Sequence, residues 1–421
     1  MVLKRKNIAI ISDQYYPDMS APSAVIDKYV QVLKNEKYTF HIITVSYDYD
    51  FIPLLDSNVK IYYVKSFKSR LRAWGFDCIR KKKNKFLAHF SLFLVRCHTL
   101  CISQIAYPFT TKWLIPKYHR TLEEIHSRVN LDCVITVSNT ICSQFAGLKF
   151  KNNHPNIKWI TFFTDPFTDH YIYYPFFKYK KSLRARHFKD EMMIYNTADY
   201  NMLTKELYDR AINNFNQPLH KTSLIEFTLN RQIYKNTIVN SFNYGLTQRV
   251  SLVYAGALYK NIRNPEGMLK IVSQTKGVKL DLYIKHRECS DIVDRYLSEF
   301  IVRKSLVNRE KYLQMINDEY DILVNIGNIS SLQTPSKMLE LLSTGKPIVN
   351  FYVVKDVQYY LLEKYPLGIN LDSNDSESIS KLECFCRENR GKRLSFDQVI
   401  SLYPENCLET QVKLLKGLID I

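Results

Sequence analysis

The feature that most constrains the fold of this chain is a strand–helix–strand rhythm that fills its first half and then starts again. In the first half, short apolar runs of the kind that form buried strands stand at 7–12, 40–47, 59–67, 131–138, 157–165 and 198–204. A segment with helical spacing of apolar residues, 23–35, lies between the first two runs. Continuous apolar runs separated by helices predict a parallel sheet with helices on both faces.

The second series opens with the strand-like run at 249–256 and continues with strands predicted at 278–284, 320–327 and 346–354. A helix is expected near 291–303. A chain of 421 residues is long for one domain and comfortable for two. We therefore predict an N-terminal domain at 1–230, a linker at 231–248, a second domain at 249–400 and a C-terminal helix at 401–421. Both domains should be doubly wound α/β domains of Rossmann type.

Composition narrows the classes of function. The chain has only 11 glycines, and it contains neither a G-x-G-x-x-G nor a G-x-x-x-x-G-K-[ST] phosphate loop. Its nine cysteines show no zinc-type spacing, so we expect reduced thiols and a cytoplasmic protein. No run of about 18 apolar residues predicts a membrane-spanning helix. The formal net charge of +18 favours anionic partners.

The segment TPSKMLELLSTGKPIV, 334–349, predicts a helix that begins at the carboxyl end of a strand. Thr334 can cap this helix, Pro335 suits its first turn and Gly345 suits its end. A helix N-terminus at the carboxyl edge of a parallel sheet favours a phosphate group. Ser336 and Glu340 share one face of the helix, and Glu340 could accept hydrogen bonds from sugar hydroxyls. The alternative is an ordinary strand–helix–strand unit with a chance Lys/Glu pair.

Residues 307–349 resemble the donor-binding segment of glycosyltransferases with the GT-B fold, especially those of family 4 from bacterial surface-polysaccharide synthesis. That family carries a Pro-Ser-Lys helix start, a glutamate along the helix and a Gly-Lys-Pro stop. Weaker resemblance extends to 8–33, to FFTDPF at 162–167 and to 252–272.

The resemblance implies two Rossmann-like domains that face across a cleft. The second would bind a nucleotide sugar, which we expect to be a UDP-sugar, and the first would bind a saccharide or lipid-linked saccharide acceptor. The reaction would be a metal-independent, hexosyltransferase-like transfer to a hydroxyl, with the nucleotide sugar as a substrate and no cofactor. The alternatives are a sugar-nucleotide epimerase on the same fold and a degenerate, membrane-associated scaffold without activity.

Site residues follow from the resemblance position by position. Glu340 matches the glutamate that binds the nucleotide ribose, and Asp165 matches the acid of the Asp-Pro-aromatic element, a candidate catalytic residue. The other positions are candidate donor-binding residues: the helix start Thr334, Pro335, Ser336 and Lys337, the basic residues Lys260 and Arg263, and Ser20 and Ser23 of the first loop.

Three positions depart from the family pattern. Leu332 stands where many relatives have a first glutamate, and Ser20-Ala21-Pro22-Ser23 replaces a Gly-Gly pair. The residues at 285–287, Lys-His-Arg, replace a glycine-rich turn. These departures are the reason to keep the inactive scaffold as an alternative.

A basic, aromatic-rich insertion at 68–120 interrupts the first domain. Its candidate membrane-docking residues are Trp74, Arg80, Lys81, Lys82 and Lys83, and a second basic cluster lies at 171–189. Basic residues with interleaved aromatic rings predict docking to an anionic membrane surface, here the inner face of the plasma membrane. The alternative is a solvated basic face. We expect no nucleic-acid partner, because no module signature accompanies the charge.

Two weaker signals concern metal binding and catalysis. Asp48 and Asp50 form an Asp-x-Asp that could hold a metal ion with a nucleotide sugar in a different glycosyltransferase fold. His170 and His187 lie near Asp165 in the sequence and could reach an active site. Because short matches arise by chance, we predict no metal site.

Overall fold

The computed structural model describes residues 5–16, 19–45, 56–65, 67–81, 85–97, 112–138, 140–168, 181–234, 249–284, 288–329 and 337–421. The chain divides into two compact units, Met1–Glu226 with Gln411–Ile421, and Phe227–Thr410. Most of the predicted linker lies outside the described residues, and its first part, 231–234, belongs to the second unit.

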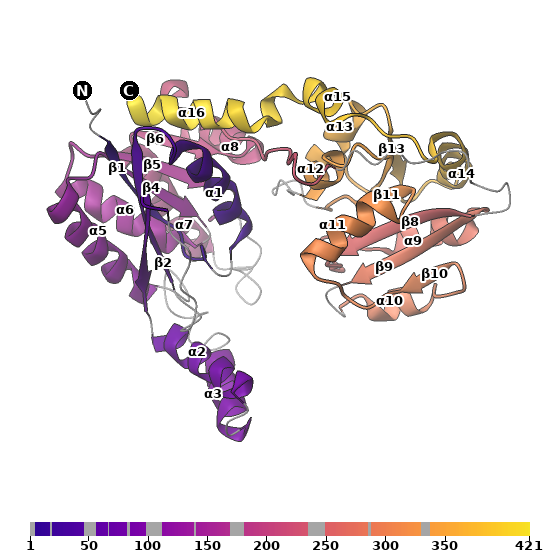
Figure 1. The fold of residues 1–421 in the computed structure, drawn as a ribbon, viewed down its shortest axis with the longest axis horizontal. Coiled ribbons are helices and arrows are strands. Elements are labelled where there is room, and N and C mark those ends of the chain that lie inside the picture. The colour runs from indigo at the N-terminus through magenta and orange to yellow at the C-terminus, as the bar shows by residue number, and fades with distance from the viewer. Residues whose placement is uncertain are drawn as a thin grey trace. The chain divides into compact units, whose positions relative to one another are not determined.

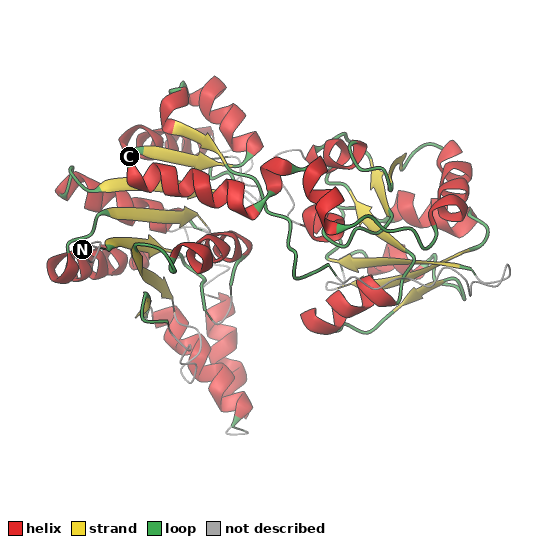
Figure 2. Cartoon of the chain, turned by 45° about the horizontal axis from the view of Figure 1, so that its top comes forward, coloured by secondary structure: helices red, strands yellow, loops and turns green. Residues whose placement is uncertain are grey.

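The first unit is built on a parallel sheet with the strand order β3-β2-β1-β4-β5-β6-β7 (Figures 1 and 2). The order reverses between β1 and β4, as in doubly wound folds. The strand bounds are β1 Lys6–Ile11, β2 Tyr38–Val45, β3 Val59–Val64, β4 Cys133–Ser138, β5 Lys158–Phe163, β6 Tyr200–Leu203 and β7 Thr222–Leu224. The α/β fold class predicted from the sequence is confirmed.

Helices cover both faces of this sheet because its strands are apolar on both sides; β4, for example, is buried at every residue. The helices are α1 Ala21–Leu33, α2 Phe67–Arg80, α3 Lys85–Cys97, α5 Ile115–Val129, α6 Ile141–Asn153, α7 Lys181–Thr197 and α8 Lys205–Phe215. Sequence reasoning missed α8, since its buried residues are only Leu207, Ala211 and Phe215, each four apart. Across the described ranges, no helix is long and apolar enough to cross a bilayer.

The second unit has its own parallel sheet, in the order β10-β9-β8-β11-β12-β13. Its strands are β8 Val250–Gly256, β9 Val278–Ile284, β10 Ile301–Arg303, β11 Ile322–Ile326, β12 Ile348–Tyr352 and β13 Gly368–Asp372. Its helices are α9 Glu266–Gln274, α10 Ser290–Asp294, α11 Arg309–Asp318, α12 Lys337–Leu342, α13 Val357–Glu363, α14 Glu377–Asn389 and α15 Phe396–Leu402.

One predicted element of the second unit is wrong. The helix expected near 291–303 ends at Asp294, and residues 301–303 form the edge strand β10. Ile301 pairs with Leu280 of β9, whose N–H donates to the Phe300 carbonyl at 2.7 Å. The edge of the sheet therefore offers residues 301–303 backbone hydrogen-bond partners, and this pairing competes with an extension of α10.

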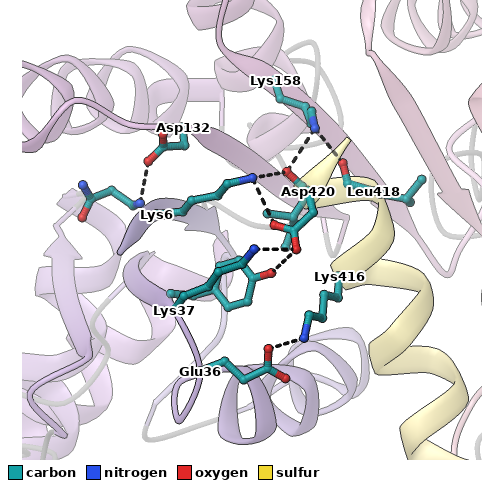
Figure 3. Close-up of polar contacts among 11 residues, drawn as sticks. Lys6, Glu36, Lys37, Asp132, Lys158, Lys416, Leu418 and Asp420 are labelled. Atoms are coloured by element: carbon teal, nitrogen blue, oxygen red, sulfur yellow. Dashed lines mark hydrogen bonds and ion pairs between the residues drawn. The ribbon is translucent and has the colours of Figure 1, made fainter. Parts of the chain in front are cut away.

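The last helix, α16 Leu408–Asp420, returns the chain to the first unit. Its end is held by the Asp420 carboxylate, which lies 3.0 Å from Lys6 Nζ, 3.0 Å from Lys37 Nζ and 2.9 Å from Tyr38 Oη (Figure 3). Lys158 Nζ donates to two of the last carbonyl groups of the helix, at 2.9 and 3.1 Å. The two ends of the chain are thus joined in one unit.

Candidate functional site

A pocket of about 400 Å³ opens in the second unit, where α11 and α12 meet the ends of β8 and β9. Its lining residues come from all four of these elements and from the loop before α11: Ala255, Gly256, Tyr283, Leu306, Val307, Tyr312, Lys337 and Glu340. It therefore lies at the carboxyl edge of a parallel sheet, which is the usual ligand position in open α/β folds.

Lys337 supplies the cationic end of this pocket. Its Nζ donates a hydrogen bond to the Ala255 carbonyl and lies 4.3 Å from the ring centroid of Tyr254. Burial, and next the nearby Arg263 guanidinium, lower the pKa of Lys337 to about 7. A Cβ added at Gly256 would lie 3.1 Å from Lys337 Nζ, so a glycine here leaves room for the amine.

Glu340 supplies the acidic end, one turn further along α12. Its carboxylate accepts a hydrogen bond of 2.8 Å from Arg309 Nη2. It also accepts one from the Tyr312 hydroxyl; burial and then this carboxylate raise the pKa of Tyr312 well above its ordinary value. Because Arg309 is largely exposed, its charged group can return to water if a ligand hydroxyl takes its place at Glu340.

The structure separates the two predicted basic residues of the second unit. Arg263 hydrogen-bonds to the Tyr254 phenol oxygen and lies near enough to Lys337 to lower its pKa. Lys260 is exposed and pairs instead with Asp291 of α10, at 2.9 Å. Arg263 is therefore placed beside the cationic end of the pocket, and Lys260 is not.

The start of the predicted donor helix lies outside the described residues. Thr334, Pro335, Ser336 and Leu332 belong to this part, and α12 begins at Lys337. The phosphate site at this helix start remains a prediction. Arg309 and Tyr312 were missed by sequence reasoning, since only the packing of α11 beside α12 brings them to Glu340.

Asp165 lies in the turn after β5, at the carboxyl edge of the first sheet. Burial raises the pKa of its carboxyl group, and a 3.3 Å hydrogen bond from Thr164 Oγ1 opposes this effect. A carboxyl group with a raised pKa is a suitable proton acceptor or donor.

Ser20 and Ser23 have structural partners at the start of α1. Ser20 caps the helix, and its Oγ lies 2.6 Å from Ser23 Oγ. Ser23 is fully buried, with its Oγ also 2.6 Å from Ser12 Oγ. These hydroxyl groups satisfy one another.

A second acid at this edge, Asp13, was missed by sequence reasoning although it directly follows the first predicted strand. It is buried and accepts hydrogen bonds from Tyr118 Oη, at 2.5 Å, and from Thr140 Oγ1. Burial raises its pKa more than these bonds lower it.

The residues of the weaker metal and histidine hypotheses fall mostly outside the described part of the chain. This is true of Asp48, Asp50 and His170. His187 is buried against Phe167, with ring centroids 4.5 Å apart, and burial lowers its pKa to about 4. Among the described residues, no group of three or more His, Cys, Asp or Glu side chains is arranged to hold a metal ion.

The predicted membrane-docking residues lie on or near α2. Trp74 is exposed, and Lys81 pairs with Asp77 at 3.0 Å. The Arg80 side chain and residues Lys82 and Lys83 lie outside what the structure describes. Sequence reasoning placed Phe86 beside this basic run, but it did not use the other exposed apolar residues of α3.

A scan of protein families finds no match to the chain, and a search of curated proteins finds none. Solved structures do match it over nearly its whole length. Sucrose-phosphate synthase from Thermosynechococcus elongatus has a TM-score of 0.67 at 12% identity, covering 99% of this chain and 98% of that one. HepE from Anabaena, in complex with UDP and glucose, has a TM-score of 0.63 at 10% identity, covering 99% and 100%.

The same fold also occurs in a protein of a different enzyme class. A putative UDP-N-acetylglucosamine 2-epimerase from Listeria monocytogenes has a TM-score of 0.53 at 11% identity, covering 99% of this chain and 96% of that one. At these identities the comparisons establish the fold, which is the GT-B fold expected from the sequence.

Proposed function

From this GT-B fold, we propose that the protein is a glycosyltransferase that moves a sugar from a nucleotide-sugar donor to an acceptor hydroxyl. The observation that carries the proposal is the pocket of the second unit, which is lined by the Lys337 amine and the Glu340 carboxylate, with the Arg263 guanidinium close to Lys337. A nucleoside diphosphate offers the matching groups, a diphosphate for the cations and ribose hydroxyls for the carboxylate. We propose a UDP-sugar, in line with the UDP bound by the HepE structure.

The reaction breaks the bond between the anomeric carbon of the sugar and the diphosphate oxygen. A new bond forms from this carbon to the acceptor oxygen, the hydroxyl proton passes to a base, and the nucleoside diphosphate leaves. Lys337 and Arg263 would stabilise the charge that develops on the leaving diphosphate, a role that a metal ion fills in other enzymes. Asp165, with its raised pKa, is our candidate for the base.

A donor screen tests this proposal. We expect release of the nucleoside diphosphate from one sugar nucleotide, with product formed on a saccharide or lipid-linked saccharide acceptor. Wild-type protein that binds no nucleoside diphosphate and releases none from any donor would overturn the proposal and favour the inactive scaffold.

The epimerase alternative has the support of the Listeria structure. The product of the reaction distinguishes an epimerase from a transferase. An epimerase would convert one sugar nucleotide into its isomer without any acceptor, whereas a transferase would leave the sugar unchanged and attach it to the acceptor.

We propose further that the acceptor is lipid-linked, in surface-polysaccharide synthesis, and that the first unit docks on the cytosolic face of the plasma membrane. The support for membrane docking is the distribution of apolar residues on α3, which is the reverse of that on an ordinary surface helix. The exposed side of α3 is apolar, with Phe86, Leu87, Phe90, Phe93 and Leu94 all more than 40% exposed. These positions are spaced like one face of a helix.

The side of α3 that packs on α2 carries two small residues beside the half-buried Leu92, which also lies close to Gly75 of α2. Ala88 and Ser91 are buried there, and a Cβ added at Gly75 of α2 would lie 2.3 Å from Ser91 Oγ. A surface helix of a globular protein normally buries its large apolar residues and exposes its polar ones. An exposed apolar face of this kind is typical of a helix that contacts an apolar medium, such as the interior of a bilayer.

Charge selects an anionic bilayer as this medium. Arg70 of α2, Lys81 just after that helix and Arg96 of α3 are exposed. Basic groups beside interfacial aromatic rings favour anionic headgroups by about 1 kcal/mol per residue.

Vesicle co-sedimentation tests the docking. We expect binding to vesicles with anionic lipid that falls with added salt, and loss of binding when Phe86, Phe90 and Phe93 are replaced by serine. Replacing Arg80, Lys81, Lys82 and Lys83 by glutamine should weaken it too. Leu297→Ser, at a residue 41% exposed in the second unit, is the matched control. Equal binding to neutral vesicles, or none to either kind, would reject the docking role.

A further inference from the structure

A ladder of three asparagines joins neighbouring strands of the second sheet, and two of them, Asn325 and Asn350, are buried. Asn325 of β11 stands in register with Asn350 of β12, which stands in register with Asn370 of β13. Each side chain donates to the next, from Asn325 Nδ2 to Asn350 Oδ1 at 2.8 Å and from Asn350 Nδ2 to Asn370 Oδ1 at 2.8 Å. Buried amides of this kind stabilise a fold only when the network is complete.

The ladder continues toward the carboxyl edge of the sheet through two side chains at the start of α13. Asn325 Nδ2 also donates to Gln358 Oε1, at 2.9 Å, and Gln358 Nε2 donates to Asp356 Oδ2, at 2.8 Å. Asp356 is buried and caps α13 by accepting from the Tyr359 N–H at 3.1 Å. Its carboxylate is therefore fixed from two directions.

Asp356 in turn fixes the loop after β11. Its Oδ2 accepts the Asn328 N–H at 3.1 Å, and the next residue, Ile329, donates its N–H to the Ile262 carbonyl at 2.8 Å. Asn328 is only 3% exposed, and its Oδ1 accepts a hydrogen bond of 2.9 Å from Arg263 Nη2. The network thus ends on the guanidinium group beside the pocket.

The Arg263 guanidinium is held by Asn328, but one of its hydrogen-bond donors has no acceptor among the described residues. Arg263 Nε is buried and has no hydrogen-bond partner among the residues that the structure describes. The neutral Asn328 amide orients the group without cancelling its charge. An arginine oriented in this way, next to the ammonium group of Lys337, suits an anionic ligand group.

We infer that Asn328 is a positioning residue, which aims Arg263 at the anionic part of the donor, and that Asp356, itself held by Gln358, keeps Asn328 in place. This inference rests on the proposed function for the identity of the donor. The test of the inference itself assumes only that an anion binds at Arg263.

The test is calorimetric titration of the intact chain with UDP and, separately, with inorganic pyrophosphate. We expect Asn328→Ala to weaken the binding of both by about ten-fold, since one charged hydrogen bond that sets the orientation is lost. Asn328→Asp keeps the shape of the side chain, and it should weaken binding at least as much because its carboxylate competes with phosphate for Arg263. If the alanine variant does not fold, Asn328→Asp alone still tests the inference.

Two further variants separate positioning from stability. Asn370→Ala cuts the far end of the ladder, so it should lower the melting temperature while both affinities stay within about two-fold of wild type. In an Arg263→Ala background, Asn328→Ala should change either affinity by less than about two-fold, because the residue acts through Arg263.

The inference is overturned if the chain binds UDP and both Asn328 variants bind it as tightly, or if Asn328→Ala has its full effect without Arg263. Binding of pyrophosphate with the expected dependence, but of no nucleoside diphosphate, would reject the proposed function and leave the positioning role standing. Binding of neither ligand would overturn both.

Discussion

At the scale of single residues, we expect Lys337 to make the binding of the proposed donor depend on pH. Its pKa of about 7 means that the amine loses its proton as the pH rises through neutrality. An anion binds the protonated form better, so we expect the affinity for UDP to fall several-fold between pH 7 and pH 9, where the diphosphate itself stays ionised. Lys337→Arg should bind with no such decline, because arginine does not titrate in this range. Calorimetry across this range gives the answer, and a flat wild-type profile would contradict it.

Glu340 should contribute directly to the affinity for nucleoside diphosphates. Glu340→Ala removes the acceptor for charged hydrogen bonds, and we expect binding to weaken by about 1–3 kcal/mol. Glu340→Gln should lose less, since its amide oxygen still accepts. Glu363→Ala, at an exposed glutamate of α13, is the control. Unchanged affinity of Glu340→Ala for every common nucleoside diphosphate would remove Glu340 from the site.

Sequence reasoning predicts part of this site and misses the rest for a physical reason. Lys337 and Glu340 belong to one short motif, so a single stretch of sequence predicts both. Arg309 and Asn328 form hydrogen bonds with Glu340 and Arg263, and these contacts depend on how helices and loops pack. No local pattern carries that information.

At the scale of elements, the contact between α2 and α3 depends on Gly75. A Cβ at this position would come within 2.3 Å of Ser91 Oγ, which already donates to the Ala88 carbonyl at 2.9 Å. We expect Gly75→Val to separate the two helices. Hydrogen exchange should then show lost protection over 67–97, and vesicle binding should fall, while UDP affinity stays at the wild-type value. Unchanged protection would contradict this packing.

The elements themselves were predicted best where the pattern is strong. Parallel strands read as long apolar runs, and β1, β2, β4 and β5 lie where these runs predict them. Strands β7 and β10 were missed because three residues carry little periodicity, and β13 was missed because its sequence, GINLD, has only one buried residue and no apolar run.

At the scale of the whole molecule, Asp420 fastens the end of the chain to the first unit. Burial acts to raise its pKa, but hydrogen bonds from Lys37, Lys6 and Tyr38 outweigh this and lower the pKa to about 2. A lowered pKa means that the carboxylate stabilises the fold fully above pH about 4 and loses this effect as the pH falls toward 2. Asp420→Asn should cost up to about 1 kcal/mol in urea unfolding at pH 7. This difference should shrink toward pH 2.5, and a difference that is constant with pH would count against the assignment.

Removing residues 411–421 should act on the first unit alone. Calorimetry should show a lower melting temperature for that unit, and UDP binding by the second unit should persist. Equal loss in both units would mean that the helix serves the whole chain. The sequence predicted one C-terminal helix at 401–421, whereas α15 ends at Leu402 and α16 begins at Leu408. The partners of Asp420, Lys6 and Lys37, lie more than 380 residues away in the chain, and no local pattern points there.

The return of α16 has a consequence for the order in which the protein can be made. The second unit is one continuous stretch, Phe227–Thr410, and it lies between the two parts of the first. During synthesis, the sheet of the first unit leaves the ribosome early, yet residues 411–421, which complete this unit, leave only after the whole second unit. We therefore expect the second unit to be complete first, while the first unit waits for residues 411–421 before it reaches full stability.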